Sequence, residues 1–309
     1  MKIVFMGTPA FACASLESLY NSGHDIVGVY TQPDKPRNRG GNVSYSPIKT
    51  IALERGSKVF QPDSFNSPQV IDELRMLQCD LIVVVAYGQL LPAEALEIPP
   101  LGCINIHASL LPKYRGAAPI QWAVIKGERE TGVTAMYMAR ELDTGDVISS
   151  KKTYIGEEET AGELHDRLSV IGAELLIETI NSITEGTAAR MPQNHLEATY
   201  APQLDRSISP IDWGDSAYNI KCKVRGLSPW PGATAVFSGS IFKIHSVAIA
   251  EKASGGHITE VGYTPGDIIS YGNHGIEVAC SDGSVIIKEL QAAGGRRMTA
   301  AEYLRGHAL

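Results

Sequence analysis

The chain has 309 residues and a formal net charge of −7, with 44% hydrophobic and 20% charged residues. This composition is typical of a globular protein and excludes a disordered, collagen-like or coiled-coil chain. No apolar run approaches the ~20 residues that span a bilayer, and the opening MKIVFMGTP lacks the apolar segment of a signal peptide. We therefore expect a cytoplasmic protein.

The cysteines argue against both a disulfide framework and a metal centre. Cys13, Cys79, Cys103, Cys222 and Cys280 are scattered and contain no C-x-x-C pair. The eight histidines show no spacing typical of zinc ligands. We expect small buried thiols and no bound metal.

The first two-thirds of the chain alternates strand-like and helix-like patterns. Strands are expected at residues 2–6, 25–30, 80–85, 102–107 and 132–138. Helices are expected at residues 11–22, 47–55, 67–77, 118–126 and 161–185, the last with Thr160 and Glu163 as a capping box. Several strands are continuously apolar, as in strands buried on both faces. The order predicts an α/β fold with a doubly wound, Rossmann-like parallel sheet.

The pattern changes after residue 189. Residues 190–207 have little periodicity and are predicted to be a linker between a domain at 1–189 and another at 208–309. After a helix at 215–225, five short strands are expected at residues 233–237, 241–250, 267–271, 275–280 and 285–290. Gly-rich turns separate them, which predicts a small OB-like β-barrel. The charge also divides, with −8 over residues 1–205 and +1 over the rest.

Asn105 and His107 are unusual residues for a buried strand. Two positions apart, they point to the same side of a strand, at the carboxyl end where open α/β sheets bind ligands. They are either a hydrogen-bonded core pair or part of a site, and the position at the strand's end favours a site.

Asp143 lies in a second polar cluster, the sequence DTGD. Gly145 permits a tight turn that aims one carboxylate inward, although this motif by itself fits a simple turn equally well. Asn, His and Asp together suit acyl transfer: Asn donates to an oxyanion, His exchanges a proton, and Asp orients the His and favours its charged form. No activated nucleophile is visible, which favours direct transfer between two bound substrates.

Nucleotide-binding motifs are absent from the sequence, but the composition of one loop suits phosphate binding. The turn MGTPAF has one glycine where a dinucleotide site needs three, and no P-loop motif occurs. The loop at 32–49 carries Lys35, Arg37 and Arg39 beside two glycines. Such a loop suits a phosphate-rich ligand, although a solvated loop has nearly the same composition.

With these residues in view, the whole chain resembles the methionyl-tRNA formyltransferases, a branch of the folate-dependent formyltransferase family. The motifs are VFMGTPAFA, RGGNVSYSPIK, INIHASLLPKYRGAAPIQWA, TGVTAMYMARELDTGDV, ATYAP, IDW, RGLSPWPGA and GGRRMTAAEYLRG. The segment 105–146 is shared by folate-dependent formyltransferases generally. The loop, linker and tail motifs are more specific to the tRNA enzymes.

The resemblance implies formyl transfer from 10-formyltetrahydrofolate to the α-amino group of methionyl initiator tRNA, in a monomer without a metal. It implies that Asn105, His107 and Asp143 are catalytic. It places the folate against Asp143 and two segments, comprising Val85, Ala86, Tyr87, Gly88, Gln89, Leu90, Leu91, Ser109, Leu110, Leu111 and Pro112. It makes 1–189 the catalytic domain and the barrel at 208–309 a tRNA-binding domain.

The resemblance also implies where the tRNA binds. Arg39 matches the loop arginine that engages the acceptor end. Gly41, Asn42 and Gln203 stand where lysines are common in the family. We therefore expect tRNA contacts from Lys35, Arg37, Arg39 and Arg206.

Three alternatives share parts of this pattern. A folate-dependent transferase for a sugar nucleotide or purine precursor would keep the Asn–His–Asp set without needing the basic loop. A formyltetrahydrofolate hydrolase would use the same set with water as acceptor. A non-catalytic RNA-binding module built on the barrel is disfavoured, because the barrel's charge is only +1 and no stacked-aromatic pattern is visible.

Overall fold

The computed structural model describes residues 1–36, 43–250 and 262–307, and it divides into two compact units. The first unit contains Met1–Pro119, Glu130–Tyr154 and His165–Ala201. The second contains Ile120–Arg129, Ile155–Leu164 and Pro202–Leu309. Two segments of the first two-thirds of the sequence thus belong to the second unit.

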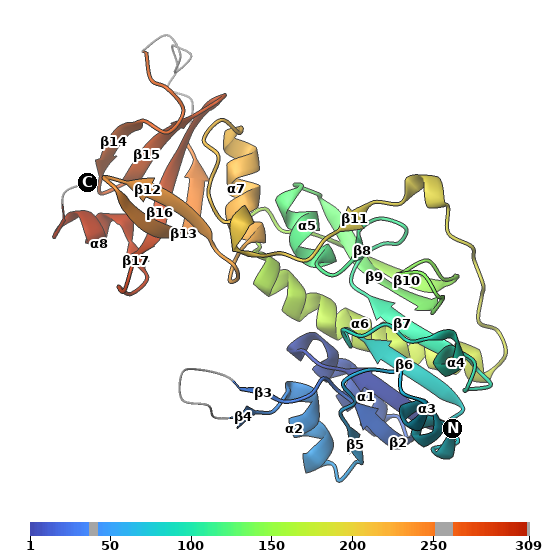
Figure 1. Cartoon of the computed structure of the whole chain (residues 1–309). Coiled ribbons are helices and arrows are strands. Elements are labelled where there is room, and N and C mark those ends of the chain that lie inside the picture. The colour runs from blue at the N-terminus through green and yellow to red at the C-terminus, as the bar shows by residue number, and fades with distance from the viewer. Residues whose placement is uncertain (37–42, 251–261, 308–309) are drawn as a thin grey trace. The chain divides into compact units, whose positions relative to one another are not determined.

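The first unit is built on a seven-stranded sheet in the order β10-β9-β7-β6-β1-β2-β5. The strands are β1 (Lys2–Gly7), β2 (Asp25–Tyr30), β5 (Val59–Phe60), β6 (Leu81–Val85), β7 (Cys103–His107), β9 (Glu130–Tyr137) and β10 (Val147–Tyr154). Strands β7, β6, β1, β2 and β5 are parallel, which confirms the Rossmann-like core. Figure 1 shows helices on both faces of this sheet.

The sheet differs from the prediction at one edge, where β9 and β10 run antiparallel. No helix lies between them among the described residues, so β10 returns beside β9 as in a long hairpin. Strand β10 was not predicted because exposed positions, among them Lys152, interrupt its apolar pattern. Lysines are common on such edge strands because they discourage pairing with another chain.

The five predicted helices fall close to their predicted positions, and the short helix α4 (Ala93–Leu96) was not predicted. The others are η1 (Ala10–Ala12), α1 (Cys13–Asn21), α2 (Pro47–Glu54), α3 (Pro68–Met76), α5 (Pro119–Ile125) and α6 (Ala161–Thr184). The predicted capping box at the start of α6 is confirmed: Glu163 accepts from the Thr160 backbone at 2.8 Å, and Glu163 N donates to the Thr160 hydroxyl at 3.3 Å. Two short hairpin strands, β3 (Lys35–Pro36) and β4 (Val43–Ser44), flank residues 37–42.

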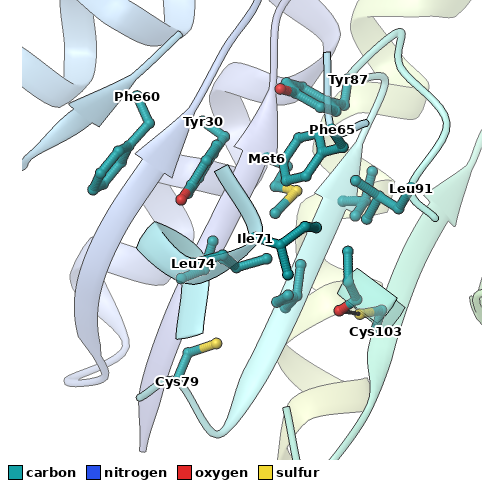
Figure 2. Close-up of a cluster of buried hydrophobic side chains, with 14 residues drawn as sticks. Met6, Tyr30, Phe60, Phe65, Ile71, Leu74, Cys79, Tyr87, Leu91 and Cys103 are labelled. Carbon is teal, nitrogen blue, oxygen red and sulfur yellow. Dashed lines mark hydrogen bonds between the residues drawn. The ribbon is translucent and has the colours of Figure 1, made fainter. Parts of the chain in front are cut away.

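A hydrophobic cluster fills one face of the sheet, under α3 and α4 (Figure 2). Tyr30 and Phe60 stack within it, with ring centroids 4.6 Å apart. On the opposite face α6 packs closely against the sheet, because a Cβ at Gly172 would lie 3.1 Å from Ile106. The alternation of β7 therefore places Ile106 under α6 and its neighbours Asn105 and His107 on the other face.

Most of the predicted linker, through Ala201, belongs to the first unit. Met191 forms an isolated bridge with Val147. Strand β11 (Tyr200–Ala201) pairs in parallel with β8 (Arg115–Gly116), directly after the segment that carries His107. A 3-10 turn, η2 (His195–Glu197), lies between these two contacts.

The second unit contains an antiparallel sheet with the strand order β12-β13-β16-β15-β14, and β17 also pairs with β16. Its elements are η3 (Arg206–Ile208), α7 (Ala217–Gly226), β12 (Ala233–Phe237), β13 (Ser240–Ile249), β14 (Ile268–Gly272), β15 (Gly275–Cys280), β16 (Gly283–Ala292), β17 (Met298–Thr299) and α8 (Ala300–Leu304). The five predicted strands are confirmed, and register shifts near Ser246 interrupt the pairing of β13. Among the described pairings none joins β12 to β14, so the barrel is not closed by a ladder.

Candidate active site

Strand β7 brings Asn105 and His107 to the carboxyl end of the sheet, on the face away from α6. Asn105 is half-buried and His107 is only 6% exposed. A buried imidazole needs hydrogen-bonding partners. Its Nε2 donates to the Tyr114 carbonyl at 2.9 Å, which fixes a proton on that nitrogen.

The other ring nitrogen of His107 faces Asp143. Its Nδ1 lies 3.6 Å from Asp143 Oδ2, which is within ion-pair range but too long for a hydrogen bond. Both ring nitrogens therefore face oxygen atoms that can only accept, so the site can accommodate the imidazole with a proton on each nitrogen. The structure thus brings together His107 and Asp143, which are 36 residues apart in the chain.

Asp143 is held in a strained conformation that turns its carboxylate inward. Its φ is +54°, in the left-handed region that non-glycine residues rarely adopt. The Oδ2 atom accepts from the backbone N–H of Gly116 at 2.8 Å. The turn depends on Gly145 as predicted, because a Cβ there would lie 1.8 Å from the Tyr137 carbonyl oxygen.

The first predicted folate segment follows β6. Ala86 and Gly88 have φ values of +48° and +84° and are exposed, and Leu90 is 71% exposed. Val85, Tyr87 and Leu91 are instead buried, so they can present only their backbone to a ligand. The Tyr87 carbonyl accepts from the Thr8 hydroxyl at 2.9 Å, and Gln89 Nε2 donates to the Pro62 carbonyl at 2.9 Å.

The second predicted folate segment follows β7. Ser109 is fully buried, and its hydroxyl donates to the Lys113 carbonyl at 2.6 Å. Thr134 donates to the Ser109 carbonyl at 2.6 Å. Ser109 therefore shapes the loop, whereas Leu110, Leu111 and Pro112 remain half-buried and available to a ligand.

The predicted tRNA-binding residues are described only in part. Arg37 and Arg39 lie outside the described residues, as do Gly41 and Asn42. The backbone of Lys35 pairs with Ser44 in the hairpin β3–β4. Arg206 begins η3 in the second unit and is exposed.

Two residues at this site were not predicted from the sequence. Arg115, in the motif KYRG, is 2% exposed, and Gln193, in the predicted linker, is 8% exposed. Arg115 Nη2 donates to Gln193 Oε1 at 2.6 Å. The sequence could have pointed to Arg115 through its position in the motif that carries His107. Nothing in the sequence around Gln193 distinguishes that residue.

The buried cysteines of the first unit are poor nucleophiles. Cys103 is on β7, two residues before Asn105, and burial raises the pKa of its thiol to about 12. Burial likewise raises the pKa of Cys79 to about 11. Thiols in this state carry almost no thiolate near pH 7, which supports transfer without a covalent enzyme intermediate.

Neither a metal centre nor a membrane helix is found in the described parts of the chain. No group of three or more His, Cys, Asp or Glu residues there could hold a metal ion. No helix there is both long and apolar enough to cross a membrane.

Comparisons with known proteins identify the family of the chain. The pattern of the family described as "Formyl transferase" matches residues 1–180, and that of "Formyl transferase, C-terminal domain" matches residues 204–308. A sugar 3N-formyl transferase, WlaRD, has a similar fold, with a TM-score of 0.69 and 18% identity over 96% of this chain and 99% of its own. The two family matches define the chain as a formyl transferase with its C-terminal domain.

Similarity over the full length defines the branch. A methionyl-tRNA formyltransferase of Acetivibrio thermocellus is 45% identical over 99% of this chain and 97% of its own. One of Alkaliphilus oremlandii is 48% identical over 100% of this chain and 97% of its own. The chain belongs to the methionyl-tRNA formyltransferase family.

Proposed function

We propose that this protein transfers the formyl group of 10-formyltetrahydrofolate to the α-amino group of methionyl initiator tRNA, using Asn105, His107 and Asp143. One observation carries the assignment of the site. A buried histidine at the carboxyl end of a parallel strand faces a carboxylate brought in by a strained turn, and Asn105 lies on the same side of that strand. Full-length similarity to methionyl-tRNA formyltransferases supports the choice of acceptor.

The reaction begins when the neutral α-amine attacks the formyl carbon. An ordinary α-amine has a pKa of about 7.7–8.0, and esterification of the neighbouring carboxylate lowers it, so a usable fraction is unprotonated at pH 7. The carbonyl π electrons move onto the formyl oxygen, which gives a tetrahedral intermediate with an oxyanion. The intermediate collapses by breaking the bond to the folate nitrogen. The amine loses one proton and the leaving nitrogen gains one.

The residues of the site stabilise the oxyanion in different ways. The Asn105 amide can donate directly, because it is half-buried and next to the strand's end. His107 already donates through Nε2 to the Tyr114 carbonyl, so its ring acts through a positive charge beside the oxyanion when Nδ1 also carries a proton. A direct bond from His107 would require the ring to exchange this carbonyl for the substrate oxygen. Asp143 balances that charge across 3.6 Å.

The folate fits the two segments beside this set. Backbone groups at Ala86 and Gly88 are exposed by their left-handed conformations, and Leu90 and Leu111 supply apolar surface. We propose that the basic loop, with Lys35, Arg37 and Arg39, and Arg206 in the second unit bind tRNA phosphates. We also propose that the protein is cytoplasmic and acts as a monomer, since one chain supplies all three catalytic residues.

The decisive assay uses 10-formyltetrahydrofolate with and without methionyl initiator tRNA, and follows both folate product and formylated tRNA. Folate product that appears only with the charged tRNA supports the proposal. Product released with water alone would instead identify a hydrolase. Turnover only with a sugar nucleotide would identify a different transferase.

Substitutions test the residues. Asn105→Asp keeps the shape of the side chain but replaces the donating amide with an anion, and His107→Ala removes the imidazole. We expect each to lower kcat by about 10²–10³-fold, the cost of losing one oxyanion donor, with binding of tRNA nearly intact. Asn181→Asp makes the same chemical change on the exposed surface of α6 and serves as the control. Wild-type kcat in Asn105→Asp or His107→Ala would refute the site assignment.

A further inference from the structure

Arg115 is a fully buried cation that the mechanism above does not use. Its Nη2 and Nε donate to Gln193 Oε1 at 2.6 and 3.2 Å. Its Nη1 and Nη2 each lie 3.3 Å from His195 Nδ1. A guanidinium has no acceptor, so His195 accepts through its Nδ1.

Gln193 carries this contact to the turn that contains Asp143. Its Nε2 donates to the carbonyl of Asp143 at 2.9 Å and to the carbonyl of Gly145 at 2.8 Å. The orientation of the amide follows from chemistry: only Oε1 can face a guanidinium, so the NH₂ group must face the two carbonyls. Every polar atom of the Gln193 side chain is therefore used between Arg115 and the turn.

Both the main-chain carbonyl and the carboxylate of Asp143 accept hydrogen bonds that depend on the segment containing Arg115 and Gly116. Arg115 acts on its main-chain carbonyl through Gln193, while the next residue, Gly116, donates to its carboxylate at 2.8 Å. The φ of +54° at Asp143 is a strained conformation that persists only where the surroundings fix it. The parallel pairing of β8 with β11 keeps Arg115 in place beside the segment that carries Gln193.

We propose that Arg115 and Gln193 are positioning residues that hold the Asp143 turn in its strained conformation and so aim the carboxylate at His107. This inference rests on the proposed function, in which Asp143 acts through His107. In this arrangement Arg115 and Gln193 act through Asp143.

Gln193→Glu tests the proposal, because it keeps the contact with Arg115 and removes the hydrogen bonds to the Asp143 turn. The new carboxylate still accepts from Arg115 and adds an attractive charge, so the fold should be kept. The side facing the turn loses both donors and sets an oxygen against two carbonyl oxygens. We expect kcat to fall about 10- to 100-fold, as for a displacement near 1 Å at a reacting group, with a cooperative unfolding transition retained and an unchanged KM for methionyl-tRNA.

Two further variants complete the design. Gln69→Glu makes the same chemical change at an exposed position of α3, away from the turn, and should leave kcat unchanged. Gln193→Asn keeps the amide but is one methylene too short to bridge Arg115 and the turn. It should lower kcat as Gln193→Glu does, without introducing a charge.

A double-substitution cycle with Asp143→Asn distinguishes positioning from a general structural effect. If Gln193 acts through Asp143, Asp143→Asn with Gln193→Glu should be no slower than Asp143→Asn alone. Effects that multiply would overturn the proposal, as would wild-type kcat in Gln193→Glu. Wild-type kcat in Asp143→Asn would instead overturn the proposed role of Asp143 itself, and the two failures are therefore distinguishable.

Discussion

Tyr30 places a hydroxyl group in the hydrophobic cluster of the first unit (Figure 2). Among the described residues this hydroxyl has no hydrogen-bond partner, and burial raises the pKa of the phenol well above its usual value. A buried hydroxyl without a partner costs about 1–3 kcal/mol. The stacked contact of its ring with Phe60 keeps the residue in place.

We therefore expect Tyr30→Phe to leave the free energy of unfolding unchanged or to raise it by up to about 1 kcal/mol. Urea unfolding at pH 7 measures this. Tyr20→Phe is the matched control: its hydroxyl lies 2.6 Å from the Ser57 hydroxyl, so its loss should destabilise the protein by about 0.5–1.5 kcal/mol. A loss of stability in Tyr30→Phe comparable with that of the control would show that the Tyr30 hydroxyl has a partner, such as a buried water.

For individual residues, the sequence singled out the side chains that the structure brings together at the candidate site, but not the residues that contact them. Asn105 and His107 stood out because polar side chains are costly in an apolar strand. Gln193 did not, because its role depends on a contact with Arg115 across 78 residues. Backbone strain at Asp143 was equally hidden, since DTGD also fits an ordinary turn.

The capping box of α6 is an element whose stability depends on pH. Hydrogen bonds from the Thr160 backbone and hydroxyl to the carboxylate lower the pKa of Glu163. The folded protein therefore binds this proton more weakly than the unfolded chain, which stabilises the fold above pH ~4.3, the ordinary value for Glu. The stabilisation is lost as the pH falls through the lower pKa of the folded state.

We expect Glu163→Ala to reduce the free energy of unfolding by less than about 1 kcal/mol at pH 7. The difference from the wild type should shrink as the pH falls below 4, because protonation removes the same interaction. Chemical unfolding at pH 7 and near pH 3 measures both values. Glu157→Ala removes one exposed charge from the adjacent segment and should show no such convergence. A pH-independent difference for Glu163→Ala would contradict the argument.

The basic loop is a second element with a testable role, and its prediction comes from the sequence alone. Arg39 lies in a sequence with two other basic residues and two glycines, a composition suited to a phosphate-rich ligand. A guanidinium grips a phosphate with two parallel hydrogen bonds, which an ammonium cannot do. We expect Arg39→Ala to lower kcat/KM for methionyl-tRNA while folate binding hardly changes. Arg39→Lys should restore only part of the loss.

The salt dependence separates a phosphate contact from a general effect of charge. Each phosphate contact on a single strand contributes a slope of about −0.7 to the log–log plot, so Arg39→Ala should be shallower by about this amount. Arg75→Ala removes an exposed arginine of α3, paired with Asp72 at 2.9 Å, and should change neither kcat/KM nor the slope. If Arg39→Ala behaves like this control, the loop does not hold the tRNA through Arg39.

Strands were predictable from the sequence where their pattern and the flanking turns define them. They were missed where they form only through pairing with a distant segment. The strands Asp25–Tyr30, Ala233–Phe237 and Gly275–Cys280 match the prediction to the residue, because their patterns end at clear turns. The short strands β8 and β11 have only two residues each and exist because they pair with one another. No periodicity can show such a pair.

On the scale of the molecule, the sequence order of the chain differs from its grouping in space. Helix α5 and residues 155–164 come early in the chain, yet both belong to the unit that contains residues 202–309. Tyr218 of α7 donates to the Gly127 carbonyl at 3.1 Å, just after α5. Arg225 donates to the Gly156 and Glu159 carbonyls at 2.9 and 3.0 Å. The change in composition near residue 190 could not show that these early segments belong to the second unit, because their placement depends on helix packing.

Gly226 is the residue that lets α5 and α7 approach. A Cβ at this position would lie 2.4 Å from Ile125 Cγ1 and 2.9 Å from the Ile125 backbone nitrogen. The side chain could rotate away, but the backbone contact requires one helix to shift. We therefore expect Gly226→Ala to lower the free energy of unfolding of the full chain by about 1–3 kcal/mol, as overpacking does, even though alanine favours helices over glycine.

Gly283→Ala is the matched control, because a Cβ there meets nothing within 4 Å and the backbone is not left-handed. It should change the free energy of unfolding by less than about 0.5 kcal/mol, as most surface substitutions do. Denaturant unfolding of the full chain, followed by tryptophan fluorescence, includes Trp122 of α5 among its probes and so reports on the displaced helix. If Gly226→Ala is as stable as Gly283→Ala, α5 is not packed against α7 through this glycine, and the early segment does not contribute to the stability of the second unit in this way.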